Sequence, residues 1–173
     1  MDDDNDPSLP KPSGFIYITG RLKELIITAG GENVPPVLIE NQFKLAIPAL
    51  SNCMVIGDKR KFLTILLCLQ VEIDEDGTAT NKLTGRALEA CKVIGSTATT
   101  TDEVKSDPLW KEYLDVGMKA ANKAATSRAQ SIGKWALLST DFTEKGGELT
   151  PTLKLKRSVA AEIHTETIEA LYA

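Results

Sequence analysis

The sequence predicts an α+β fold, in which a small and mainly antiparallel sheet is covered by helices. Two apolar runs, Cys53–Ile56 and Phe62–Glu72, carry the strongest strand signals, and a five-residue polar turn joins them. A turn this short favours antiparallel pairing. A run with helical spacing between Leu109 and Ala124 supplies a covering helix. At 173 residues the chain is long enough for one domain with a core.

The N-terminal part divides into a polar stretch and a predicted hairpin. Residues 1–13 contain four aspartates and three prolines, which predicts a flexible linker or loop, and residues 14–173 form the expected domain. Phe15–Thr19 and Leu25–Thr28 alternate apolar and β-branched residues around a Gly-Arg corner. We expect them to form a hairpin beside about three core strands.

Prolines mark both ends of the first predicted helix. Pro35 and Pro36 suit a first helical turn, and Pro48 ends the helix. Its expected inward-facing residues are Val37, Ile39, Phe43 and Ala46. The next expected helix is Leu83–Ile94, after a surface loop at 74–80.

The C-terminal half is predicted to contain two further helices around one strand. Asp107 is a suitable N-cap, and the helix that follows it is expected to reach about Gly133, which gives a helical insertion at about 81–133. Trp135–Ser139 is a predicted short strand. Arg157–Tyr172 is a predicted amphipathic helix. Its expected apolar face is Val159, Ile163, Ile168 and Leu171.

Composition argues against several functional classes. The net charge of −4 gives no electrostatic reason to expect nucleic-acid binding. No apolar run approaches the ~20 residues that a membrane-spanning helix needs. Cys53 and Cys68 lie in apolar runs and are expected to be buried thiols in a reducing compartment. No metal site is expected, because the cysteines are widely spaced and His164, expected at the surface, is the single histidine.

Two segments carry chemical features. In GRLKELIITAGGENVPP, which begins at Gly20, a hairpin leads through a glycine loop into a helix, an arrangement that suits anions. In LTPTLKLKR, which begins at Leu149, three cations fall within four residues ahead of a helix. On the residues alone, a simple tight turn remains the alternative for the first segment. A solvated basic surface strip remains the alternative for the second.

Together, in this order, the two segments resemble the C-terminal domain of the adenylate-forming superfamily. That superfamily contains acyl-CoA synthetases, luciferases and peptide-synthetase adenylation domains, and the wording here looks most like long-chain synthetases of the bubblegum type. The resemblance spans about residue 14 to the end and is weak at 78–133. The matching positions are Arg21, Lys23, Glu24, Ile26, Gly30, Val34, Pro36, Glu40, Pro151, Lys154 and Arg157.

The resemblance implies a role for individual positions. Arg21 is expected near the ATP ribose and phosphates, and Lys23 matches the hinge about which the lid rotates. Lys154 matches the catalytic lysine of adenylation. The loop that lines the coenzyme A tunnel matches Gly30, Gly31 and Glu32. A basic turn, Lys59, Arg60 and Lys61, suits coenzyme A phosphates by charge alone, and a solvated turn is an equal alternative.

Two positions depart from the family pattern. Leu153 stands where the family has a glycine before its catalytic lysine. Lys156 offers a second cation two residues after Lys154. The spacing to Arg157 favours Lys154 as the adenylation lysine.

The implied activity is that of an AMP-forming long-chain fatty acid–CoA ligase, which uses ATP, Mg²⁺ and coenzyme A. The chain alone is expected to be inactive and to bind none of them tightly, since the acyl pocket and phosphate loop belong to the N-terminal domain. The expected location is the cytoplasm or the cytoplasmic face of a membrane, with peripheral association left to the missing part. The alternatives are a stand-alone regulatory or protein-interaction module and a luciferase-like or peptide-synthetase lid.

Overall fold

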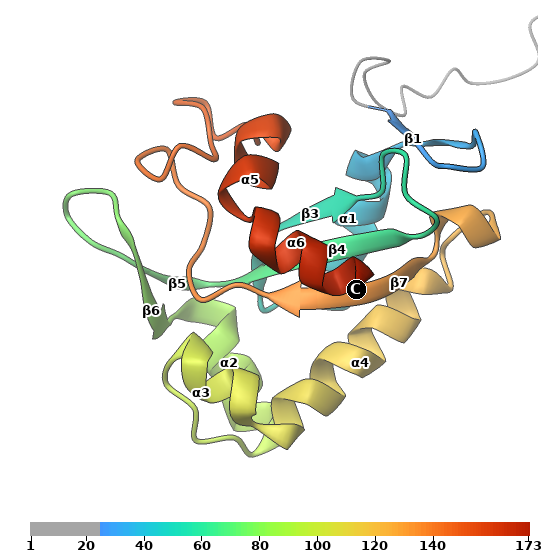
Figure 1. Cartoon of the computed structure of the whole chain (residues 1–173). Coiled ribbons are helices and arrows are strands. Elements are labelled where there is room, and N and C mark those ends of the chain that lie inside the picture. The colour runs from blue at the N-terminus through green and yellow to red at the C-terminus, as the bar shows by residue number, and fades with distance from the viewer. Residues whose placement is uncertain (1–24) are drawn as a thin grey trace, which may run out of the picture.

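A computed structural model describes residues 25–173 and shows helices packed around a central three-stranded sheet (Figure 1). Its strand order is β3 (Leu50–Ile56), β4 (Leu63–Leu69) and β7 (Ile132–Leu137). β3 and β4 are antiparallel, as the short turn predicts, whereas β4 and β7 are parallel. The predicted α+β class is therefore confirmed, with one parallel pair that the sequence did not indicate.

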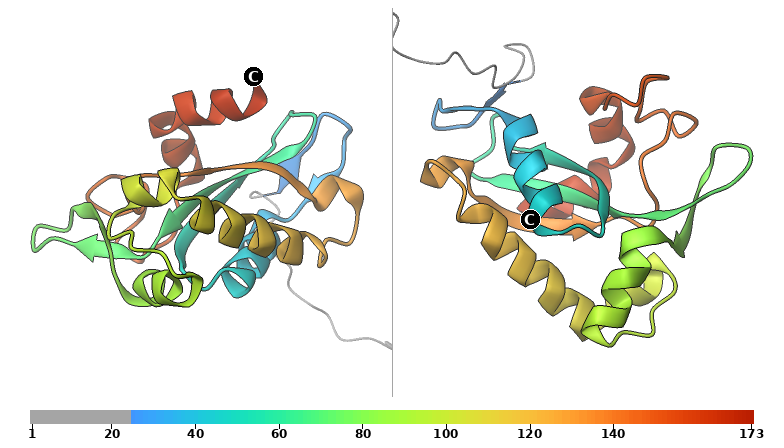
Figure 2. Two further views of the ribbon diagram at one scale, coloured as in Figure 1. Left: turned by 90° about the horizontal axis from the view of Figure 1, so that it is seen from below. Right: turned by 180° about the vertical axis from the view of Figure 1, so that it is seen from behind.

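The central strand β4 is buried on both faces. Ile65 and Leu67 belong to a core shared with α1 (Pro36–Ala46) and α4 (Pro108–Asn122). Leu66 and Cys68 point into a second core shared with α5 (Arg157–Ile163) and α6 (Thr165–Tyr172). Both views in Figure 2 show helices on either side of the sheet. Burial on two faces explains why β4 reads as a continuous apolar run.

Helix α1 follows the proline signals closely. Pro35 precedes the helix as its N-cap, and Ile47 ends it immediately before Pro48. Ile39 and Phe43 face the core, as predicted. Gly117 of α4 permits a close approach to α1, because a Cβ there would lie 2.2 Å from Cγ1 of Ile47.

The predicted strand 62–72 breaks at Gln70. The Gln70 N–H donates to the carbonyl of Ala49 at 3.0 Å, outside the β4 ladder. The chain then enters a separate antiparallel hairpin, β5 (Val71–Ile73) with β6 (Ala79–Leu83). The expected surface loop at 74–80 is largely the turn of this hairpin, and β6 was not predicted.

The segment predicted as a helical insertion, 81–133, contains three α-helices rather than two. α2 (Gly85–Ile94) agrees with the sequence, but α3 (Thr101–Ser106) was not predicted. Helix α4 ends at Asn122, well before Gly133. The Asn122 side chain exchanges two 2.9 Å hydrogen bonds with the backbone of Ile132, where β7 begins. A 3₁₀ turn, Arg128–Gln130, lies between them.

The predicted C-terminal helix is divided at His164 into α5 and α6. The Thr165 hydroxyl donates to the carbonyls of Ala161 and Glu162, which competes with regular helical bonding. Ile168 and Leu171 are buried as expected. Ile163 is 49% exposed, so its predicted inward orientation is wrong.

Candidate functional site

The first candidate loop is presented by a two-stranded hairpin. β1 (Ile26–Ile27) pairs with β2 (Asn33–Val34), and Gly30, Gly31 and Glu32 lie exposed between them. The Thr28 N–H donates to the Glu32 carbonyl at 3.1 Å, and the Gly31 N–H donates to the Thr28 carbonyl at 2.9 Å. Gly31 has φ = 78°, a conformation that favours glycine. The loop is therefore compact, with its backbone open to a ligand.

The basic turn lies against this glycine loop. The Lys59 N–H donates to the Ile27 carbonyl at 2.8 Å, and the Ala29 N–H donates to the Arg60 carbonyl at 2.9 Å. Figure 1 shows β1 beside the β3–β4 turn. Arg60 forms an ion pair with Glu169, and its guanidinium carbon lies 4.5 Å from the centre of the Tyr172 ring. Lys59 and Lys61 remain exposed, and neither forms an ion pair with another described residue.

The second candidate loop is a tight hairpin that carries Lys154. Leu149 and Leu155 form an antiparallel bridge, and the Thr150 N–H donates to the Lys154 carbonyl at 2.8 Å. The Thr150 hydroxyl oxygen accepts the Lys154 N–H at 3.1 Å. Lys154 is exposed, and it makes no ion pair with any residue in 25–173. An unpaired cation on such a loop suits a phosphate ligand.

Leu153 has φ = 59°, in the left-handed region that favours glycine. The motif resemblance implies a glycine at this position, and glycine adopts this conformation without the steric cost that leucine has. The Leu153 side chain is 72% exposed. A non-glycine residue held in this region costs about 1–2 kcal/mol.

Lys154 and Lys156 differ in their surroundings. Lys156 is partly buried, and its N–H donates to the Glu148 carbonyl at 2.7 Å, immediately before α5. Lys154 stands near the tip of the hairpin. Lys154 is therefore the more exposed of the two residues, and its choice as the adenylation lysine stays a prediction.

An ion pair between the two segments was missed by sequence reasoning. Arg157 donates from both terminal nitrogens to Glu40 on α1, at 2.7 Å each. Glu40 Oε1 also accepts the Val55 N–H of β3 at 2.8 Å. Both residues were already matched to the family motifs, so the pair could have been suggested from their opposite charges.

Other expected features can now be placed. Arg21, Lys23, the linker 1–13 and the predicted strand 15–19 lie outside the described residues. His164 was expected at the surface, but its side chain is 18% exposed. Its Nε2 lies 3.4 Å from Glu148 Oε1. All three cysteines are buried, as predicted for Cys53 and Cys68, and burial raises the pKa of the Cys53 thiol to about 12.

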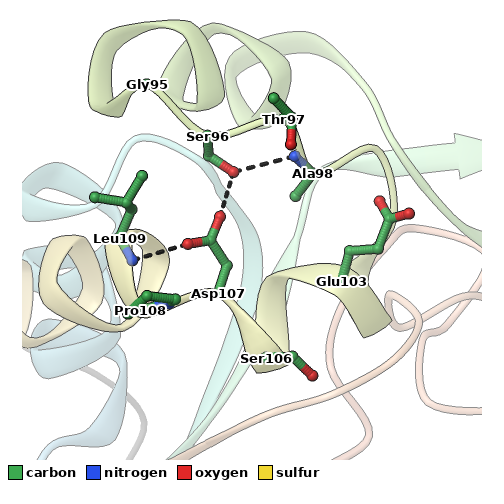
Figure 3. A pocket seen from close by; sticks show the side chains of 9 residues that line it. All are labelled: Gly95, Ser96, Thr97, Ala98, Glu103, Ser106, Asp107, Pro108 and Leu109. Atoms are coloured by element: carbon green, nitrogen blue, oxygen red, sulfur yellow. Dashed lines mark hydrogen bonds between the residues drawn. The ribbon is translucent and has the colours of Figure 1, made fainter.

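A hollow of about 370 Å³ lies beside the second loop, lined in part by Leu153, Leu149 and Asp141. Burial raises the pKa of the Asp141 carboxyl, although Asn52 donates to it at 2.9 Å. A larger hollow of about 500 Å³ lies in the insertion (Figure 3). There Asp107 accepts from Ser96 and from the Leu109 N–H, so its carboxylate serves as a helix cap.

The two candidate loops are not brought together. Both figures of the whole chain show the β1–β2 hairpin and the loop before α5 at separate ends of the molecule. Among residues 25–173 there is no group of three His, Cys, Asp or Glu side chains that could hold a metal ion. None of the helices described is long and apolar enough to cross a membrane.

Comparison with known proteins supports the family resemblance. The chain is 49% identical over 162 residues to the human long-chain-fatty-acid–CoA ligase ACSBG1, which covers 92% of the chain and 22% of the ligase. It is 50% identical over 163 residues to ACSBG2 of Gallus gallus, covering 92% of the chain and 21% of that ligase. The resemblance to bubblegum-type long-chain acyl-CoA synthetases is confirmed. The chain therefore spans about a fifth of the length of these synthetases. No protein-family model matches it.

Solved structures agree on the fold. The adenylation domain of a carboxylate reductase from Mycobacterium chelonae superposes with a TM-score of 0.62 at 22% identity, covering 89% of this chain and 20% of that one. The adenylation domain of a carboxylic acid reductase from Segniliparus rugosus gives 0.61 at 19% identity, covering 94% and 21%. These two neighbours share the α+β architecture of the chain.

Proposed function

We propose that this chain is the mobile C-terminal lid of an ATP-dependent long-chain fatty acid–CoA ligase. The observation that carries the proposal is the placement of two exposed loops, each matching a family motif, at separate ends of the molecule. One loop presents Lys154, which forms no ion pair with a described residue, and the other presents glycine backbone beside a basic turn. A domain that serves two chemical steps in turn needs two such surfaces.

In the first step, a fatty carboxylate oxygen attacks the α-phosphorus of ATP. A new O–P bond forms, the bond to the bridging oxygen breaks, and pyrophosphate leaves. Negative charge builds on the phosphate oxygens, and a preorganised ammonium there is worth several kcal/mol. The Lys154 ammonium is assigned this role. Arg21 is proposed to lie near the ATP ribose and phosphates.

In the second step, the sulfur of coenzyme A attacks the acyl carbon of the adenylate. The bond between the acyl carbon and the AMP oxygen breaks, and the thiol proton is released. Gly30, Gly31 and Glu32 are assigned to the wall of the tunnel that admits the pantetheine arm. The exposed Lys59 and Lys61 beside them suit the phosphates of the same ligand by charge.

The lid exchanges one loop for the other by rotating about Lys23 in this proposal. The acyl pocket and the phosphate loop are assigned to an N-terminal domain outside this chain, which is why the isolated chain is expected to be inactive. The described residues hold no cluster suited to a metal ion, so the Mg²⁺ that accompanies ATP is assigned to ligands elsewhere in the enzyme. The enzyme is expected in the cytoplasm or on the cytoplasmic face of a membrane.

The Lys154 assignment is tested in the full-length enzyme. Lys154→Ala should lower the rate of pyrophosphate exchange by about 10²–10³-fold, the range found when one group that stabilises developing charge is removed. Thioester formation from supplied acyl-adenylate should be spared. Lys156→Ala is the matched control and should leave both half-reactions near normal. Exchange that persists in Lys154→Ala and disappears in Lys156→Ala would move the role to Lys156.

A further inference from the structure

Glu40 and Arg157 differ in their burial from the other Lys or Arg ion pairs that the structure describes. Their side chains are 10% and 23% exposed, respectively. In every other Lys or Arg ion pair among residues 25–173, both side chains are at least 37% exposed. Exposed pairs contribute little to stability, whereas a buried, bidentate pair fixes two groups in a defined geometry.

The pair connects three elements at the open edge of the sheet. Glu40 comes from α1 and Arg157 opens α5, and these helices pack on opposite faces of the sheet. β3 is an edge strand, so the Val55 N–H that Glu40 accepts is not needed by a neighbouring strand. The Glu40 carboxylate thus holds one strand and both helical layers with three hydrogen bonds.

Arg157 lies three residues after Lys154, and the chain between them is closely held. Leu155 bridges to Leu149, and the Lys156 N–H donates to the Glu148 carbonyl at 2.7 Å. On the other side, Thr150 binds both the N–H and the carbonyl of Lys154. The hairpin therefore sets the shape of the Lys154 loop, while the pair sets where the end of that hairpin lies relative to α1.

We propose that Glu40 and Arg157 are positioning residues for adenylation, which fix the Lys154 hairpin on the body of the lid. The proposal rests on the proposed function of Lys154. Charge alone is not the reason for it, since a buried ion pair is often replaceable by apolar side chains without loss of stability. The planar fork of Arg157 defines direction as well as distance, and a displacement of about 1 Å at a reacting group can cost about 10²-fold in rate.

The test uses the full-length enzyme with Arg157→Lys and Glu40→Gln. Lysine at position 157 keeps the positive charge but loses the two parallel N–H donors of the guanidinium. Glutamine at position 40 loses the negative charge but can still accept the Val55 N–H. Each variant should lower kcat for pyrophosphate exchange by about 10–100-fold, with KM for ATP little changed. Thioester formation from supplied acyl-adenylate should stay within about twofold, because no hydrogen bond among the described residues joins the glycine loop to the pair.

Two further variants separate positioning from general stability. Lys111→Met removes an exposed ion pair with Asp115 on α4 and should leave both half-reactions unchanged. The double variant Glu40→Gln with Arg157→Lys should be no slower in exchange than either single variant, since both break one interaction. A purely structural role would lower both half-reactions in parallel with the amount of folded enzyme.

The outcomes also distinguish this inference from the proposed function. Normal exchange in Arg157→Lys and Glu40→Gln, with Lys154→Ala inactive, would overturn the positioning role and leave the function intact. Equal losses in both half-reactions would overturn it as well. Normal exchange in both Lys154→Ala and Lys156→Ala would remove the proposed role of this loop in adenylation and the positioning role together.

Discussion

The two candidate loops have similar shapes but are held in different ways. The glycine loop is held by backbone hydrogen bonds to the β3–β4 turn and by two side chains, since Thr28 Oγ1 accepts the Glu32 N–H and Asp58 Oδ1 accepts the Ile27 N–H, each at 3.2 Å. The Lys154 loop has the corresponding threonine bond, from the Lys154 N–H to Thr150 Oγ1, but its end is held by the buried Glu40–Arg157 pair. Each loop has one left-handed residue, which is Gly31 in the first and Leu153 in the second. Substitution at the end of the Lys154 loop should therefore cost more than substitution in the basic turn beside the glycine loop, where the ion pair is exposed.

The largest expected effect follows from breaking the buried pair. Arg157→Ala leaves the Glu40 carboxylate buried without its partner, which should lower the free energy of unfolding by about 3–5 kcal/mol. Chemical denaturation of the full-length enzyme or of a folded lid domain would measure it. A loss below about 1 kcal/mol would mean that the Lys154 loop is not held by this pair.

The matching change at the glycine loop should be much smaller. Arg60 is the one cation of the basic turn with a described partner, since it meets Glu169 and the Tyr172 ring. Arg60→Ala should cost about 1 kcal/mol, because the ion pair is exposed and the cation–π contact is modest. The same denaturation experiment measures it. A loss as large as that of Arg157→Ala would erase the contrast between the loops.

The smallest expected effect concerns Leu153, whose backbone lies in the left-handed region. Leu153→Gly relieves a backbone cost of about 1–2 kcal/mol but increases the freedom of the unfolded chain by about 0.5–1 kcal/mol. The net result should be a slight stabilisation of about 0.5 kcal/mol, read as a small rise in Tm. A clear destabilisation would show that the exposed leucine side chain makes contacts that stabilise the folded chain.

Local signals in the sequence predicted α1, the β3–β4 hairpin and the two motif loops. The ends of α1 were predictable because Pro35, Pro36 and Pro48 restrict the backbone directly. Helix α3 was missed although its signal is present: Thr100 and Glu103 form a capping box, with the Glu103 N–H donating to Thr100 Oγ1 at 3.3 Å.

Other features depend on contacts between distant residues. The end of α4 is determined by the Asn122 amide, which bonds the backbone of Ile132 ten residues later. The parallel pairing of β4 with β7 joins strands on either side of the helical insertion, and no local pattern specifies it. The Glu40–Arg157 pair spans 117 residues. Its two members lay in recognised motifs, but only the folded chain shows that they meet.

The separate use of the two loops is tested most directly by Gly30→Leu in the full-length enzyme. Gly30 suits this test because a Cβ there meets only the Thr28 hydroxyl, at 3.7 Å, whereas Gly31 would be strained by any side chain. Gly30→Ala is the matched control.

Both half-reactions should be measured in the same preparation of Gly30→Leu. We predict that thioester formation from supplied acyl-adenylate falls by at least about tenfold, while pyrophosphate exchange stays within about twofold of normal. This pattern is the reverse of the one expected for Lys154→Ala. Unimpaired thioester formation, or an equal loss in both half-reactions, would contradict the assignment of one loop to each step.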